Sequence, residues 1–281
     1  MYSWRVVLSA NSILFVSSSL SGAAIVGVLW WKDVIRPTSL DKTRDVSGVP
    51  TPVWLLCAAM VFLAQMEGGL LVSQLKDSAI GPARSLRHDA IVQLASYGVG
   101  VAVAALMVFL LRPRAGEKAG LAVGWRDVPH GALAMLLAAP LCICVAMVCQ
   151  LFASKEDTVA HEGLRRIIEN RDSPWGAALA LCAVLGAPIV EEVVYRGCLQ
   201  SALLGTLRSG WGAIIGTSTI FAAMHFVGGG PVPLHALPPL FVLSVSMGVA
   251  YEHTKRLGVP ITMHVLFNLA NVIVGVATHP R

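Results

Sequence analysis

The sequence predicts an all-α fold, a polytopic bundle of about eight transmembrane helices. The 281 residues are 56% hydrophobic and only 13% charged, whereas soluble domains average about 25% charged residues. Uncharged runs long enough to cross a hydrocarbon core of roughly 30 Å also recur along the chain. We therefore expect an integral, multipass protein of the cell membrane, with the lipid bilayer as its surroundings.

The uncharged runs and their flanks place the expected helices. The expected ranges are about 8–31, 52–74, 90–111, 131–153, 174–206, 211–227, 236–252 and 259–277. Residues 209–251 carry no charged side chain, but the sequence GGGPVP at 228–233 divides this stretch into two helices. We expect a single integral membrane domain, 1–281, in which 1–153 holds four N-terminal helices and 174–277 a four-helix core.

The charge and cysteine content exclude two other classes of protein. The formal net charge is +5, but the basic residues lie largely between the apolar runs, which is typical of membrane-surface anchoring and not of nucleic acid binding. The six cysteines lie in or beside apolar helices and form no C-x-x-C pair, so neither a disulfide framework nor a zinc knuckle is indicated.

Three charged side chains lie inside the fifth apolar run. The sequence APIVEEVVYRG contains Glu191, Glu192 and Arg196, and each ionisable group in lipid costs about 2.5–3.5 kcal/mol on insertion scales. Glu192 and Arg196 are spaced i,i+4 and share a helix face, whereas Glu191 lies about 100° round the axis. One glutamate is therefore expected to be paired and the other available.

Two later apolar runs carry further polar side chains. The sequence FAAMH ends in His225, and HVLFN contains His264 and Asn268 at i,i+4 spacing. If the fifth and sixth helices turn near residues 208–210, Glu191 and His225 each lie roughly 22 Å from the turn and can meet. The same count of the rise per residue places His264 roughly 13 Å too shallow, so tilt, a shorter seventh helix or an off-axis position is required.

The three segments EEVVYR, FAAMH and HVLFN resemble, in this order, the E-E-x-x-x-R, F-x-x-x-H and H-x-x-x-N/D motifs of the CPBP family. This family, named for CAAX proteases and bacteriocin-processing proteins, consists of intramembrane endopeptidases of the Abi type. The resemblance covers roughly residues 174–277, and the first four helices match only in being hydrophobic.

The resemblance implies a reaction and a division of roles. Glu191 and His225 would activate a water molecule for attack on a peptide bond in a membrane-tethered or lipid-modified protein substrate. His264 and Asn268 would steady the oxyanion.

The same resemblance gives Glu192 and Arg196 a supporting role. It leaves the cofactor open, because the family has been described both as metalloproteases and as metal-independent glutamate proteases. Glu191, His225 and His264 are the candidate ligands if zinc is required; a glutamate-type enzyme would need no cofactor.

Other protease chemistries fit this sequence less well. There is no H-E-x-x-H motif, the nearest match being HEGLR at 161–165 in a charged connection, and Ser218 lacks a G-x-S-x-G context. Two other classes of function stay open: a non-proteolytic membrane binding or immunity protein, and a proton-coupled transporter that uses glutamate and histidine as a relay. Glu67, the remaining acidic residue well inside an apolar run, is assigned no role.

Overall fold

The computed structural model describes residues 10–40, 44–75, 77–80, 82, 85–152, 162–227 and 234–278, and this part of the chain is helical, without strands. Its first half contains α1 (Ala10–Trp31), α2 (Thr51–Ser73), α3 (Asp77–Ile80), α4 (Leu86–Ala115), η1 (Glu117–Ala119), α5 (Asp127–Gln150) and α6 (Glu162–Glu169). The second half contains α7 (Pro174–Leu181), η2 (Cys182–Gly186), α8 (Ala187–Glu192), η3 (Val193–Leu199), α9 (Gln200–Leu207), α10 (Gly210–Val227), η4 (Leu234–Ala236), α11 (Leu237–Thr254) and α12 (Gly258–Thr278).

The predicted helical bundle is confirmed, and the chain is an integral, multipass membrane protein. Seven helical runs in the described part are long and apolar enough to cross a membrane. They comprise α1, α2, α4, α5, the continuous run α7 to α9, η4 with α11, and α12. The remaining expected helix, α10, also forms, but its 18 residues lie outside this set. The GGGPVP sequence at 228–233 lies outside the described residues, between the end of α10 and η4.

Local capping explains where two of the helices begin. The Ser85 side chain accepts a hydrogen bond from the backbone N–H of His88, so α4 begins at Leu86, earlier than the expected position 90. Ser173 caps α7 in the same way, and Pro174 occupies the first turn, where its missing N–H costs nothing.

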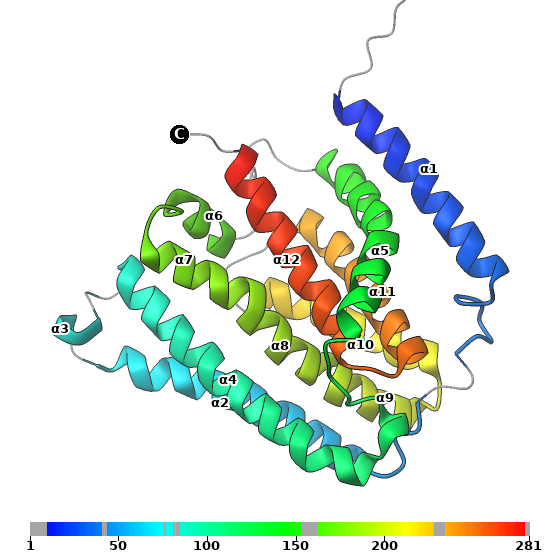
Figure 1. Ribbon diagram of the computed structural model, residues 1–281, viewed down its shortest axis with the longest axis horizontal. Coiled ribbons are helices and arrows are strands. Elements are labelled where there is room, and N and C mark those ends of the chain that lie inside the picture. Colours follow the sequence, from blue (N-terminus) through cyan, green and yellow to red (C-terminus); the bar gives the residue numbers. More distant parts are fainter. Residues whose placement is uncertain are drawn as a thin grey trace, which may run out of the picture.

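The long run from α7 to α9 passes through the middle of the bundle. In Figure 1 the pair α2 and α4 lies along one side of this run and α12 along the other, with α5 beyond α12. Helix α1 stands at the edge, packed against α5. The run therefore meets both the N-terminal helices and the motif-bearing helices of the C-terminal half.

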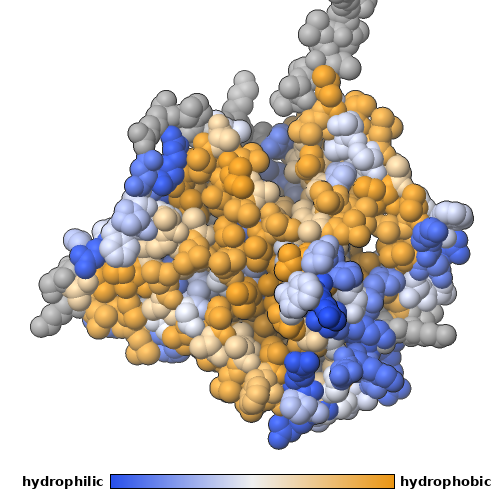
Figure 2. Space-filling view, in the orientation of Figure 1, coloured by the Kyte–Doolittle hydropathy of each residue, from blue (hydrophilic) through white to orange (hydrophobic). Residues whose placement is uncertain are grey.

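The surface of the bundle agrees with a membrane location. Figure 2 shows hydrophobic residues over most of the visible face, with hydrophilic residues gathered toward the ends of the helices. Large apolar side chains such as Leu20, Leu71, Phe109 and Leu136 are exposed on the outside of the bundle. Lipid rather than water is the solvent in which such a surface is stable.

A buried ion pair joins the segment before α2 to the end of α11. The side chains of Arg44 and Glu252 are fully buried, and Arg44 Nη2 lies 2.9 Å from Glu252 Oε1. Arg44 also donates to the carbonyl of Ala119 and the hydroxyl of Ser201, and Gln200 Nε2 donates to the same Glu252 oxygen at 2.8 Å. The pair therefore connects the N-terminal half to the core through groups that satisfy one another.

Removing one member of this pair is expected to destabilise the protein strongly. Arg44→Ala or Glu252→Ala leaves a charge buried without its partner, which costs about 3–5 kcal/mol. The free energy of unfolding in detergent measures this loss. The exposed pair formed by Arg165 and Glu162 provides the control, because Glu162→Ala should leave the free energy of unfolding nearly unchanged. Equal effects at both pairs would contradict the assignment of Arg44 and Glu252 as a structural connection.

Candidate active site

The two adjacent glutamates of α8 lie in different surroundings. Glu192 is fully buried, and its Oε1 accepts hydrogen bonds from Arg196 Nη1 at 3.1 Å and from His264 Nδ1 at 2.8 Å. Glu191 keeps 24% of its side chain exposed, and its Oε2 atom lies 4.0 Å from His264 Nε2. Adjacent residues on a helix point about 100° apart, so one carboxylate is enclosed and the other faces open space.

Arg196 contacts Ser244 and Phe221 as well as Glu192. Its Nη2 atom donates to the hydroxyl of Ser244 at 2.7 Å and to the Ser244 carbonyl at 3.1 Å. Its guanidinium also lies over the ring of Phe221, 4.9 Å from the centroid. The i,i+4 pairing of Glu192 with Arg196, expected from the spacing, is present and buried.

His264 lies deeper in the bundle than the sequence predicted. Counting the helical rise per residue placed His264 roughly 13 Å too shallow, whereas its ring contacts both glutamates. The two turns are not at the same level: residues 205–209, around the turn from α9 to α10, are exposed, whereas residues 258–260 at the start of α12 are buried. Helix α12 therefore begins inside the bundle, which brings His264 to the level of the glutamates.

His225 has a defined ring orientation. Its Nδ1 atom lies 2.8 Å from the carbonyl oxygen of Phe221, one turn earlier on α10. A carbonyl only accepts hydrogen bonds, so Nδ1 carries a proton, and in the neutral ring Nε2 is an acceptor. The Phe221 ring packs 4.6 Å from the ring of His225 and 5.9 Å from that of His264, between the two histidines.

One cavity of about 530 Å³ brings the candidate residues together. Its lining includes Glu191, His225, His264 and Asn268, whereas Glu192 and Arg196 lie behind this lining. Elements far apart in the chain therefore present four polar side chains to one space.

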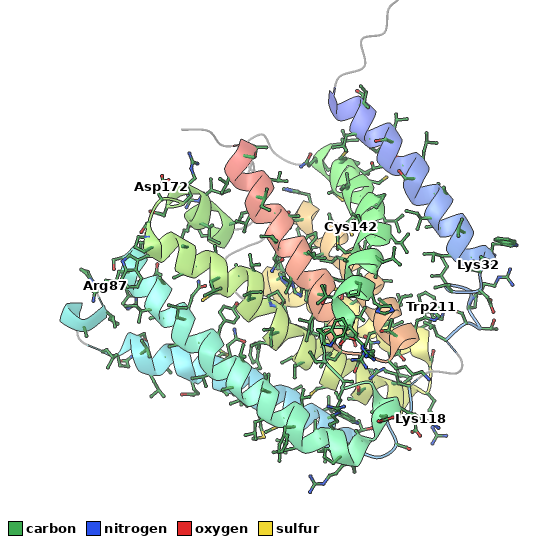
Figure 3. The ribbon with its side chains drawn as sticks, viewed as in Figure 1. Lys32, Arg87, Lys118, Cys142, Asp172 and Trp211 are labelled. Atoms are coloured by element: carbon green, nitrogen blue, oxygen red, sulfur yellow. The ribbon has the colours of Figure 1, made fainter. Side chains whose placement is uncertain are left out.

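Part of the cavity wall comes from helices that carried no functional signal in the sequence. Gln93 and Tyr97 of α4 line it, as do Cys142 and Gln150 of α5, and the adjoining wall comes from α6. Figure 3 labels Cys142 on α5, which packs against α12. No motif in the N-terminal helices pointed to these residues, because only the packing of α4 and α5 brings them to the site.

Asn268 makes a contact that the sequence did not predict. Its Nδ2 atom donates a hydrogen bond of 2.8 Å to the carbonyl oxygen of Ala183, in the π-helical turn η2. Because the amide nitrogen carries two protons, one N–H remains for the cavity that Asn268 also lines.

The arrangement of donors does not make a ready metal site. No group of three His, Cys, Asp or Glu side chains in the described residues is placed to hold one metal ion. Of the three candidate ligands, His264 and His225 each use Nδ1 for a hydrogen bond and keep Nε2, and Glu191 keeps Oε2 without a hydrogen-bond partner.

The chain was compared with known protein families. Residues 173–270 match the family model described as type II CAAX prenyl endopeptidase Rce1-like. We refer to this segment, which resembles that family, as the Rce1-like domain. The resemblance to the CPBP family drawn from the three motifs is thereby confirmed over the helices that carry them. Neither a curated protein nor a solved structure matches the chain.

The Rce1-like domain begins at the cap of α7 and extends into α12. It contains all six residues singled out in the sequence, and the match supports a CAAX-type intramembrane protease family. The N-terminal helices that complete the cavity wall lie outside the matched segment.

The two glutamates are expected to differ in their contribution to stability. Glu192→Ala leaves Arg196 buried without its carboxylate, so the free energy of unfolding should fall by about 3–5 kcal/mol. Glu191→Ala removes a partly exposed side chain without a hydrogen-bond partner on Oε2 and should cost far less. Unfolding of both variants in the same detergent measures the difference, and a larger loss for Glu191→Ala would contradict the assignment of Glu192 as the buried support.

Proposed function

We propose that the cavity hydrolyses a peptide bond in a membrane-tethered or lipid-modified protein. The observation that carries this proposal is the shared cavity, to which Glu191 presents a carboxylate and His225 an acceptor nitrogen. The Rce1-like domain supports the same reaction class. We also propose the cell membrane as its location, and 1–281 as one functional domain, because α4, α5 and α6 complete the cavity.

The attacking water is activated between Glu191 and His225. Both groups accept hydrogen bonds, so a water molecule donates one O–H to each and directs its oxygen lone pair at the scissile carbonyl. Glu191 takes a proton as the new C–O bond forms. It then returns that proton to the leaving nitrogen as the C–N bond breaks, which balances the hydrolysis.

His264 and Asn268 steady the negative oxygen of the tetrahedral intermediate. Asn268 provides the N–H that Ala183 does not use. The Nδ1–H of His264 is engaged by Glu192, so donation from Nε2 requires protons on both ring nitrogens. Donors directed at a developing oxyanion lower the barrier.

Glu192 and Arg196 act as the support of this site. Neither lines the cavity, but Glu192 fixes the ring of His264 through Nδ1, and Arg196 neutralises the buried carboxylate. The side chain that orients a catalytic histidine sets where its other nitrogen points. Their role is therefore to hold His264 and not to react.

The two groups that activate water can be tested directly. In liposomes with a panel of membrane-anchored substrates, including prenylated ones, Glu191→Gln and His225→Ala should each lower kcat by about 10²–10⁴-fold. Glu67→Gln is the matched control, because Glu67 is an exposed glutamate of α2 that does not line the cavity. Undiminished cleavage by Glu191→Gln or His225→Ala would overturn the site. A wild type that cleaves no substrate in the panel would favour the binding or transporter function.

The metal requirement has its own test. Because Glu191, His225 and His264 do not form a ready three-ligand site, we expect cleavage to persist after incubation with a chelator. Elemental analysis of the purified protein should give far less than one zinc per chain. Loss of activity with the chelator that added zinc restores would instead assign these residues as ligands.

A further inference from the structure

The helical run that carries the glutamates contains a carbonyl without a backbone donor. In the π-helical turn η2, the N–H of Ala187 donates to the carbonyl of Cys182, five residues earlier. The next donor in this pattern would be residue 188, five residues after Ala183, but this position is Pro188, which has no N–H. The Ala183 carbonyl therefore receives no hydrogen bond from the residue four positions later, whose N–H goes to Cys182, or from the residue five positions later, which is proline.

A side chain from another helix provides the missing hydrogen-bond donor. Asn268 Nδ2 donates to the Ala183 carbonyl at 2.8 Å. A carbonyl inside a membrane protein is costly without a donor, because no bulk water replaces the missing bond. The proline in the run therefore creates the acceptor that attracts an asparagine of α12.

This hydrogen bond bears on the position of the whole of α12. His264 lies one turn before Asn268, on the same face of the helix, and bonds to Glu192. Helix α12 is therefore tied to the α7–α9 run at two places, Asn268 to Ala183 and His264 to Glu192. Two ties along one face fix both the rotation of α12 and its position along the run.

We propose that Pro188 is a positioning residue of the active site. By withholding an N–H from the Ala183 carbonyl, it reserves that oxygen for Asn268. The tie then sets the height of His264 beside Glu191 and Glu192. The consequence for cleavage rests on the proposed function, whereas the tie itself does not. Pro188 thus contributes to the site by lacking a donor, and not by bending the helix alone.

A double-mutant cycle between Pro188 and Asn268 tests the tie without any substrate. Asn268→Ala removes the donor and should lower the Tm in detergent by about 2–4 °C. Pro188→Ala supplies a backbone N–H that continues the five-residue pattern to Ala183, so Asn268→Ala in this background should lower the Tm by less than about 1 °C. Equal losses in both backgrounds would overturn the tie.

Asn271 provides the matched control for this cycle. It lies on the same helix, but its Nδ2 atom donates to the carbonyl of Phe267 within α12. Asn271→Ala should therefore change the Tm by the same amount with and without Pro188. A dependence on Pro188 as large as that of Asn268→Ala would mean that the coupling is not specific to the Ala183 carbonyl, and would overturn the proposal.

Kinetics on a cleaved substrate test the positioning role. Pro188→Ala removes no reacting group from the chain but releases the tie that sets the height of His264, so kcat should fall about tenfold or more with KM unchanged. An unchanged kcat would overturn the positioning role even with a coupled Tm. A wild type that cleaves nothing would count against the proposed function, while the Tm cycle would still decide the tie.

Discussion

The buried carboxylate of Glu192 is the group on which the rest of the site depends. Its Oε1 atom accepts from Arg196 on its own helix and from His264 on α12. A buried carboxylate needs such partners, because a charge in a medium of low dielectric is expensive without them. The same requirement that neutralises Glu192 thus draws α12 against α8 and sets the orientation of His264.

Once Glu192 is paired, Glu191 is free for a different use. It lies one residue earlier and about 100° round the helix, where it faces the cavity shared with His225, His264 and Asn268. Of the two adjacent glutamates of α8, Glu192 is therefore the structural residue and Glu191 the one that is available to the cavity. The positions of His225 and His264 depend in turn on Phe221, which packs between their rings and beneath Arg196.

Irregular helix geometry and the N-terminal helices complete this arrangement. The π-helical turns η2 and η3 lie on either side of α8, and such turns often occur at functional sites. Here η2 leaves a carbonyl that Asn268 satisfies. On the outer side, α4 and α5 provide cavity walls, and the buried pair of Arg44 and Glu252 holds the segment before α2 to α11. The matched family segment supplies the polar groups, and the rest of the chain encloses them.

The helical membrane fold, the pairing of Glu192 with Arg196 and the separate direction of Glu191 could all be predicted from the amino-acid sequence alone. These follow from composition and from the 3.6-residue period, which act over one or two turns of a single helix. The packed bundle was needed to find the depth of His264, the hydrogen bond from Asn268 to Ala183 and the cavity wall from α4 and α5. The first two depend on how far α12 is displaced along the α7–α9 run, and the cavity wall depends on how α4 and α5 pack around the site, all through contacts distant in the chain.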